Sequence, residues 1–259
     1  MEAALKALTI AGMATIAGAL FPSSADAQRR GGRRGGFGGE CMGAIEPNTP
    51  YDGRFTFARI RYREIYSVGW AYDYPCTEKN FATILKEITA VRSYMEGGNV
   101  FDFDDPELFR FPIAYVSEPG YWYPSDAEAE GLRTFLAKGG FVIFDDFHFA
   151  NEWMVFEAGL RKALPDAKIV PMEASHPIFD SFFRISSLAL TYPGDPSLRA
   201  EFYGIHEGND PTKRLMVIIN YNNDLGNYIE HSGGGWYPVN LTNDAYKYVV
   251  NYVVYGLTR

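Results

Sequence analysis

Strand-like and helix-like segments alternate along the chain from about residue 55 to residue 258. Phe55–Tyr62 alternates apolar and polar residues, as a half-buried strand does. Phe141–Phe144 is apolar throughout, as expected for a central strand that is buried on both faces. This alternation predicts an α/β fold with a mostly parallel, doubly wound sheet and helices on both of its faces, in flavodoxin-like layers.

The other predicted elements follow from the same periodicities. A helix after Thr77 carries an apolar stripe, and Ser125 with Glu128 forms a capping-box pattern at the next helix. Asn243 is expected to cap the last helix. The further predicted elements are the strands Val100–Phe103, Ile113–Val116, Lys168–Val170, Phe202–Ile205 and Leu215–Asn220, and the helix Asn151–Leu164.

The first 27 residues are expected to be a signal peptide. Lys6 precedes the apolar stretch Ala7–Phe21, and the small residues Ala25 and Ala27 mark a cleavage site before Gln28. The stretch is short for a membrane span of about 20 residues, although an uncleaved anchor is the alternative. The protein is therefore expected to be periplasmic or secreted, and no later segment of the mature chain is expected to span a membrane.

Residues 28–50 form an Arg- and Gly-rich linker that is expected to be disordered, and residues 51–259 form a single α/β domain. The linker is a flexible tether or a weak contact for anionic surfaces. The chain carries 24 basic and 32 acidic side chains, a formal net charge of −8. Because nucleic-acid-binding proteins present basic surfaces, nucleic acid is not an expected partner.

The chain has two cysteines, Cys41 and Cys76. In an oxidising compartment they can pair and pin the entry segment of the domain to a loop. Cysteine spacing does not show whether their Cα atoms come within bonding distance, so the disulfide is a candidate only.

Ionisable residues cluster after the predicted strands, where ligands bind in open α/β sheets. Asp145 and Asp146 follow the predicted central strand, and two adjacent carboxylates there can raise one another's pKa. One can act as a general base, or both can hold a metal ion with His148 or His176; alternatively they bind loop N–H groups. Asp145, Asp146, His148 and His176 are thus the candidate catalytic residues.

Polar and aromatic residues of neighbouring loops are candidates for ligand binding. Tyr and Trp rings can stack on sugars or peptides, although they also wall loops over a core. The candidates are Asp73, Glu118, Tyr121, Trp122, Asn222 and Asp224. No zinc-binding H-E-x-x-H motif, nucleophile elbow or phosphate-binding loop is present, so no cofactor is expected and the metal state stays open.

Several motifs occur together in a recognisable order. They include DPELFRFPIAYV at Asp105–Val116, LRTFLAKGGFVIFDDF at Leu132–Phe147, HPIF at His176–Phe179 and NYNNDLGNYIEH at Asn220–His231. With these motifs the chain resembles, from about Phe55 to its C-terminus, the family called domain of unknown function 4159.

The resemblance implies a fold like that of class I glutamine amidotransferases. It also implies partners in the bacterial envelope that are linked to MoxR-type ATPases and von Willebrand A-domain proteins. Enzymes of that fold carry a nucleophilic Cys on the turn after a central strand, where this chain has Asp145 and Asp146. A thiolate mechanism is therefore not expected.

Two functions follow from these observations. The first is a non-catalytic module of the envelope that binds a ligand or partner at the ends of the strands. The second is a hydrolase of glycans or peptides that uses Asp146 with His148 or His176. A site with Asp146 close to His176 would favour the hydrolase, whereas a rim sealed by Trp70 and Trp122 would favour the binding module.

Overall fold

The sheet of the domain is the element that positions every candidate site residue. The structure is a computed structural model, and it describes residues 45–63, 69–190, 192, 194–195 and 197–259. In this part of the chain one seven-stranded sheet has the order β2-β1-β3-β4-β7-β6-β5. The strands are β1 (Phe55–Ile60), β2 (Ser93–Phe101), β3 (Ile113–Ser117), β4 (Phe141–Phe147), β5 (Val170–Pro171), β6 (Glu201–His206) and β7 (Leu215–Tyr221).

The predicted mostly parallel, doubly wound sheet is confirmed. Strands β2, β1, β3, β4 and β7 are parallel, whereas β6 is antiparallel to β7 and β5 is antiparallel to β6. The order of the parallel strands is that of a flavodoxin-like sheet, with the change of winding direction between β1 and β3. Ligands of such sheets bind at the carboxyl ends of the strands near this point.

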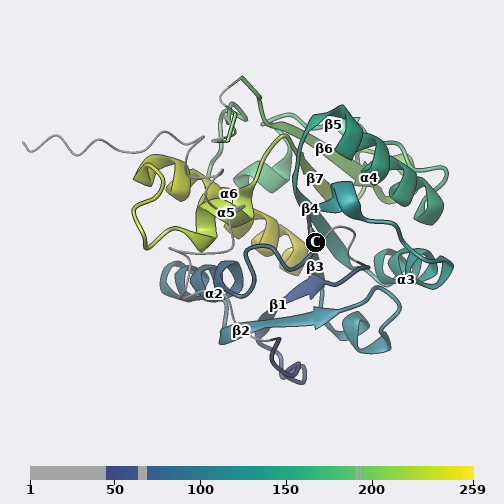
Figure 1. Cartoon of the computed structure of the whole chain (residues 1–259), viewed down its shortest axis with the longest axis horizontal. Helices are drawn as coiled ribbons and strands as arrows, with labels where there is room; N and C mark the ends of the chain where they lie inside the picture. The colour runs from purple at the N-terminus through teal and green to yellow at the C-terminus, as the bar shows by residue number, and fades with distance from the viewer. Residues whose placement is uncertain (1–44, 64–68, 191, 193, 196) are drawn as a thin grey trace, which may run out of the picture.

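Helices cover both faces of the sheet (Figure 1). Helices α2, α5 and α6 lie on one face, and α3 and α4 lie on the other. The bounds are α2 (Cys76–Ile88), α3 (Asp126–Ala137), α4 (Phe149–Ala163), α5 (Leu225–Glu230) and α6 (Val239–Thr258), with the 3-10 turns η1 (Pro106–Arg110), η2 (Pro119–Tyr121), η3 (Pro177–Asp180) and η4 (Glu207–Asn209).

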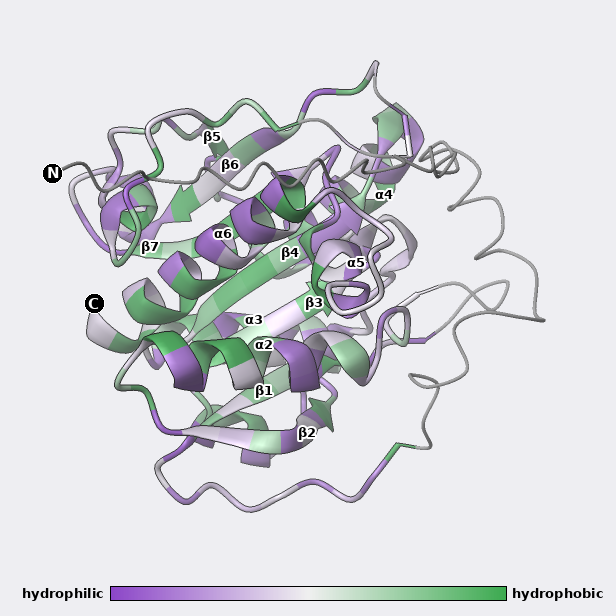
Figure 2. Ribbon diagram, turned by 90° about the vertical axis from the view of Figure 1, so that its left-hand side faces the viewer, coloured by the Kyte–Doolittle hydropathy of each residue, from purple (hydrophilic) through white to green (hydrophobic). Residues whose placement is uncertain are grey.

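Each face of the sheet has its own hydrophobic core. Strand β4 contributes Phe141 and Ile143 to the core under α6, and Val142 and Phe144 to the core under α3 and α4. Figure 2 shows this central strand coloured as hydrophobic between helices whose outward residues are hydrophilic. The continuous apolar run in the sequence is therefore explained by burial on both faces.

The prediction that the first strand is half-buried was wrong. All six residues of β1 are buried, including Arg59, which forms an ion pair with Glu78 of α2. Nε of Arg59 lies 2.5 Å from Oε1 of Glu78. Arg59 shares the face of β1 that carries Phe55 and Phe57, and the ion pair with Glu78 allows this charged residue to be buried there.

Several boundaries also differ from the prediction. The last helix begins at Val239, so Asn243 lies within it and does not cap it. The edge strand β2 begins at Ser93, well before the predicted Val100. Its first half was not predicted because it lacks an apolar run. Helix α5 was not predicted, since six residues are too few for helical periodicity. The capping box of Ser125 and Glu128 is confirmed.

The N-terminal predictions lie outside the described residues. These are the signal peptide, most of the linker and Cys41. Cys76, the first residue of α2, is buried and disulfide-bonded. Among the described helices, none combines the length and the apolar character that crossing a bilayer requires.

Leu136 is expected to be a main contributor to the core on the α3 side. It is buried in α3 against the sheet, so Leu136→Ala removes apolar contacts and leaves a cavity. We expect the free energy of unfolding to fall by about 2–5 kcal/mol in urea denaturation. Met154→Ala, at an exposed position of α4, is the control with a change within about 0.5 kcal/mol. A loss below about 1 kcal/mol for Leu136→Ala would contradict the assignment.

Candidate functional site

Carboxylates from several loops meet at the carboxyl edge of the parallel strands. Asp73 lies between β1 and α2, Glu118 directly follows β3, Asp146 lies near the end of β4, and Asp224 follows β7. Strands β1 and β3 flank the point where the winding direction changes. The sheet therefore brings to one place acidic residues that are as far apart in sequence as Asp73 and Asp224.

Asp145 has a structural role in this edge. Its side chain is fully buried, and Oδ2 accepts hydrogen bonds from the hydroxyl of Tyr115 at 2.7 Å and from the backbone N–H groups of Leu225 and Gly226 at 3.0 Å each. Oδ1 accepts a further bond from the amide of Asn220 at 3.0 Å. Asp145 therefore fixes the first turn of α5 against the sheet.

Asp146, the next residue, is placed quite differently. The register between β4 and β7 shifts between Phe144 and Phe147, and Asp146 within this irregularity has a φ of 64°. Its side chain turns into the group of carboxylates at the strand ends and remains 6% exposed. Two adjacent aspartates thus have separate roles: Asp145 supports the fold, and Asp146 belongs to the candidate site.

Three carboxylates form the centre of the site, which we call the acidic cluster: Asp73, Asp146 and Asp224. One oxygen of each lies within 4.8 Å of an oxygen of both others. Among the ion pairs of the described residues, none involves these three side chains. An arrangement of acceptor oxygens of this kind is suited to a positively charged ligand or a metal ion.

Burial and mutual repulsion make the acidic cluster electrostatically unfavourable. The pKa values of Asp146 and Asp224 are raised well above their usual range, first by burial and then by neighbouring carboxylates. The pKa of Asp73 is likewise raised by burial and by Glu230. The carboxyl groups of the cluster therefore hold their protons to a higher pH than free aspartates do, and a bound cation would replace these protons.

More ionisable residues surround the acidic cluster on two sides. On one side lie Glu118 and Glu152, whose pKa values are raised mainly by burial. Glu152 accepts a hydrogen bond from the hydroxyl of Tyr121 at 3.4 Å. On the other side lies Glu230, whose charge and side-chain hydrogen bond raise the pKa of Asp73. The negative character thus extends beyond the three central carboxylates.

An aromatic stack borders the site on the Glu230 side. The ring of His231 is stacked on Trp236, with centroids 5.2 Å apart, and Nε2 of His231 lies 3.4 Å from Glu230. Trp236 is exposed. Its exposed ring can stack on a ligand that reaches His231.

Arg59 holds the loop that carries Asp73. Its Nη1 group donates hydrogen bonds to the carbonyl oxygens of Trp70 at 2.9 Å and Tyr72 at 2.8 Å. Nε of Arg59 pairs with Glu78, Nη2 is buried without a hydrogen-bond partner among the described residues, and the charge of the guanidinium lowers the pKa of Asp73. The buried ion pair of β1 therefore positions one wall of the site.

Four polar residues at this edge adopt the left-handed backbone conformation that is uncommon outside glycine. Their φ values are 62° for Asp73, 52° for Glu118, 64° for Asp146 and 53° for Asn222. Such conformations cost free energy and concentrate at functional sites. Each turn directs a side chain that a regular strand end would place elsewhere.

The two predicted histidines are separated. His148 follows β4, and its backbone N–H donates to Glu152 at 2.5 Å; burial lowers the pKa of its imidazole to about 4. The grouping of His176 with Asp146 was wrong, because Nε2 of His176 lies 3.4 Å from Nε2 of His206. His206 ends β6 beside Leu215 at the start of β7, which is the opposite edge of the sheet.

The predicted ligand-binding residues also divide into groups. Asp73, Glu118 and Asp224 lie at the site, and Tyr121 borders it through Glu152. Trp122 does not, because it is fully buried against Phe103 and Phe144.

Asn222 supports the site without joining the acidic cluster. Its side-chain oxygen accepts a hydrogen bond from the N–H of Phe149 at 3.1 Å, and its own N–H donates to the carbonyl of Phe147 at 3.0 Å. Asn222 therefore ties the loop after β7 to the start of α4.

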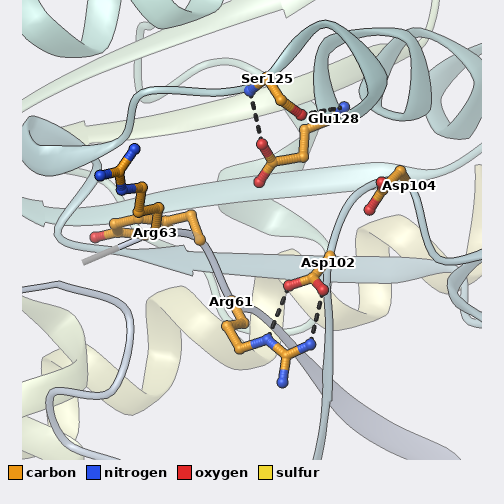
Figure 3. A pocket seen from close by; sticks show the side chains of 7 residues that line it. Arg61, Arg63, Asp102, Asp104, Ser125 and Glu128 are labelled. Carbon is orange, nitrogen blue, oxygen red and sulfur yellow. Dashed lines mark hydrogen bonds and ion pairs between the residues drawn. The ribbon is translucent and has the colours of Figure 1, made fainter.

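A separate cavity of about 370 Å³ opens beside the ends of β1 and β2 (Figure 3). Its polar groups largely satisfy one another: Arg61 forms a two-point ion pair with Asp102, and Ser125 and Glu128 form the capping box. This cavity therefore lacks the concentration of unpaired charge that marks the acidic cluster.

Gly226 is expected to be required for the geometry of the site. A Cβ atom at this position would lie 2.7 Å from the hydroxyl of Tyr115 and 2.8 Å from Oδ2 of Asp73. Gly226→Ala should displace Asp73 and lower the free energy of unfolding by about 1–3 kcal/mol. Urea denaturation tests this, with Gly139→Ala as a comparison in which the added methyl group meets no neighbour but the φ of 101° is strained. Unchanged stability of Gly226→Ala would mean that the loop shifts to accept the methyl group without a measurable loss of stability.

A comparison with protein families identifies the family of the chain. Residues 56–257 match the family model of the domain of unknown function DUF4159. The chain belongs to this family. The match covers the seven strands of the DUF4159 domain, except Phe55 at the start of β1, and every residue of the acidic cluster. The chain matches no curated protein.

Proposed function

We propose that this DUF4159 protein is an exported, non-catalytic binding module of the bacterial envelope that holds a positively charged group of its ligand or partner. The observation that carries the proposal is the acidic cluster, in which three carboxylate oxygens lie within 4.8 Å of one another. Burying like charges together is unfavourable unless a proton or cation compensates them. A site with this composition is best explained by a cationic ligand.

The residues around the cluster support binding more than catalysis. The end of β4, where the amidotransferase-like resemblance places a nucleophilic Cys, carries Asp145 and Asp146. Trp70 is buried, whereas Trp122 lies in the core against Phe103 and Phe144, so the expected rim sealed by both rings does not contribute to this argument. His176, one of two histidines considered for acid–base chemistry, lies with His206 at the other edge.

Export and partners belong to the same proposal. The expected cleavage before Gln28 would release the domain into the periplasm or the medium, joined to its Arg- and Gly-rich segment. Envelope proteins linked to MoxR-type ATPases and von Willebrand A-domain proteins are the proposed partners. N-terminal sequencing of the exported protein tests the first step, and a sequence beginning at Met1 would refute cleavage.

The binding function is tested with probes that carry positive charge. Calorimetric titration should use spermidine, amine-bearing cell-wall fragments and divalent cations in turn. We expect at least one class to bind, and Asp146→Asn to weaken that binding at least about tenfold. Asp102→Asn, which changes a carboxylate of the separate cavity, should leave it within about twofold. Absence of binding by every class would refute the proposal.

A hydrolase remains the second candidate because of one observation. The pKa of Asp146 is raised by burial and by Glu118, and a raised carboxyl pKa is what a general acid requires. His148 is the nearer of the two histidines in sequence and adjoins Glu152. Turnover of glycan or peptide substrates that disappears in Asp146→Asn, with retained folding, would favour this reading over the binding module.

A further inference from the structure

We infer that the acidic cluster is a binding site for one divalent metal ion of the oxygen-preferring class, Ca²⁺, Mg²⁺ or Mn²⁺. Asp73, Asp146 and Asp224 would each supply one carboxylate oxygen. The inference rests on the proposed function and specifies it, because it names the cation that the site holds. The ligands come from loops that follow three different strands, β1, β4 and β7.

The spacing of the oxygens fits a single coordination sphere. All three lie within 4.8 Å of one another. Ca²⁺ binds oxygen at about 2.3–2.6 Å and Mg²⁺ at about 2.0–2.1 Å, so oxygens on opposite sides of one ion are about 4–5 Å apart. Aspartate oxygens are the preferred ligands of these hard cations.

Buried oxygens without partners provide an independent observation. Ser117 is fully buried, and its hydroxyl has no hydrogen-bond partner among the described residues. It is two residues beyond Tyr115 on β3 and in register with Asp145, so strand alternation directs all three side chains to the same face. That is the face on which the hydroxyl of Tyr115 and Oδ2 of Asp73 both approach Gly226.

Two further groups of the same region share this property. Oδ2 of Asp73 is buried without a partner, and so are both polar atoms of the Asn223 side chain, next to Asp224. Buried polar atoms in proteins are nearly always hydrogen-bonded. The unpaired Oδ2 of Asp73, which belongs to the acidic cluster, and the unpaired hydroxyl of Ser117 on the same face of the sheet therefore favour a ligand that accepts electron pairs, as a metal ion does.

The closeness of the packing favours an ion over an organic amine. Asp146 is 6% exposed, Asp224 is 3% exposed and only Asp73 is half-buried, so the site opens to solvent at Asp73 alone, which leaves a narrow passage for the chain that an ammonium group carries. The backbone of Gly226 packs so closely that a single added carbon would lie 2.8 Å from Oδ2 of Asp73. A bare cation needs no such passage.

The ligands are also held in place by neighbouring groups. Oδ1 of Asp224 accepts a hydrogen bond from the N–H of Asn227 at 2.8 Å. Asp145 fixes the turn that follows Asp224, and Arg59 fixes the loop that ends at Asp73. Partners of this kind orient metal ligands and tune affinity, and here they leave the second oxygen of Asp224 for the ion.

The experiment measures metal binding directly. Chelator-treated protein is titrated with CaCl₂, MgCl₂ and MnCl₂ by calorimetry, and bound Mn²⁺ is counted by electron paramagnetic resonance. We expect one ion per chain, and binding at least about tenfold weaker for both Asp146→Asn and Asp224→Asn. Asp102→Asn is the matched control and should stay within about twofold. Circular dichroism establishes that each variant is folded.

The outcomes separate this inference from the proposed function. If no metal binds the folded protein at up to about 10 mM, a range that includes weak extracellular Ca²⁺ sites, the inference is wrong. If spermidine or cell-wall amines then bind in an Asp146-dependent way, the proposed function stands without the metal. If metal binds but both Asp variants leave its affinity unchanged, the ion occupies another site and the inference is again wrong.

Discussion

Asp145→Ala is expected to lower the free energy of unfolding by about 3–5 kcal/mol. The carboxylate is fully buried and accepts four hydrogen bonds, from Tyr115, Asn220, Leu225 and Gly226. Alanine leaves all four donors without a partner in the protein interior, and each unpaired donor costs about 1–3 kcal/mol when it cannot reach water.

Asp145→Asn refines this expectation. Its amide oxygen can still accept from Tyr115 and α5, but its NH₂ group would face the amide of Asn220. Asn220 cannot turn freely, because its oxygen accepts a hydrogen bond from Tyr252 at 2.9 Å. The loss should therefore be smaller than for alanine but still above about 1 kcal/mol in urea denaturation. Wild-type stability for both variants would contradict the structural role of Asp145.

The architecture could be predicted from the sequence because apolar periodicity reports burial directly. The run Phe141–Phe144 has no polar residue on either face, and it is the strand at the centre of the sheet. The burial of Phe55–Ile60 was predicted wrongly. An arginine in a strand indicates an exposed position unless its buried partner, here Glu78, is known. A buried ion pair depends on two segments, and the pattern of one segment cannot reveal it.

Strand direction decided which candidate residues share the site. Residues after parallel strands meet at one edge, and this rule placed Asp73, Glu118, Asp146 and Asp224 together. It does not hold for His176, because the chain after β5 returns to the start of β7 and meets His206 there. Nothing in the short predicted strand at Lys168–Val170 indicated that its neighbour β6 is antiparallel.

The sequence also could not predict that Asp145 and Asp146 have separate roles. A strand that is buried on both faces offers no alternation from which to assign a side chain to one face. The irregularity between Phe144 and Phe147 then changes the direction of Asp146. Ser117 and Gly226 were missed for a related reason: their importance lies in what packs against them, which their residue types do not state.

Asp146→Asn is expected to raise the stability of the metal-free protein while it removes cation binding. Two unit charges that are 4.8 Å apart or closer repel by about 3 kcal/mol or more at an effective dielectric constant of about 20. Protonation relieves part of this cost, so we expect a gain of about 1–2 kcal/mol in the free energy of unfolding at pH 8. Asparagine also tolerates the φ of 64° at this position.

The sign of the pH dependence follows from the raised pKa of Asp146. A carboxyl group whose pKa is higher in the folded state stabilises the fold fully below its unfolded value of about 3.9, and this contribution is lost as the pH rises through the folded value. Asp146→Asn has no carboxyl group at this position and does not lose this contribution. The gain in its free energy of unfolding over the wild type should therefore be small at pH 5 and larger at pH 8.

Urea denaturation in the presence of a chelator at both pH values measures this difference. Asp102→Asn, which breaks an exposed ion pair with Arg61, should instead lose up to about 1 kcal/mol at either pH. A residue whose removal stabilises the fold is retained for function, since selection on stability alone would replace it. If Asp146→Asn is less stable than the wild type at pH 8, Asp146 supports the fold as Asp145 does, and the acidic cluster is a structural feature.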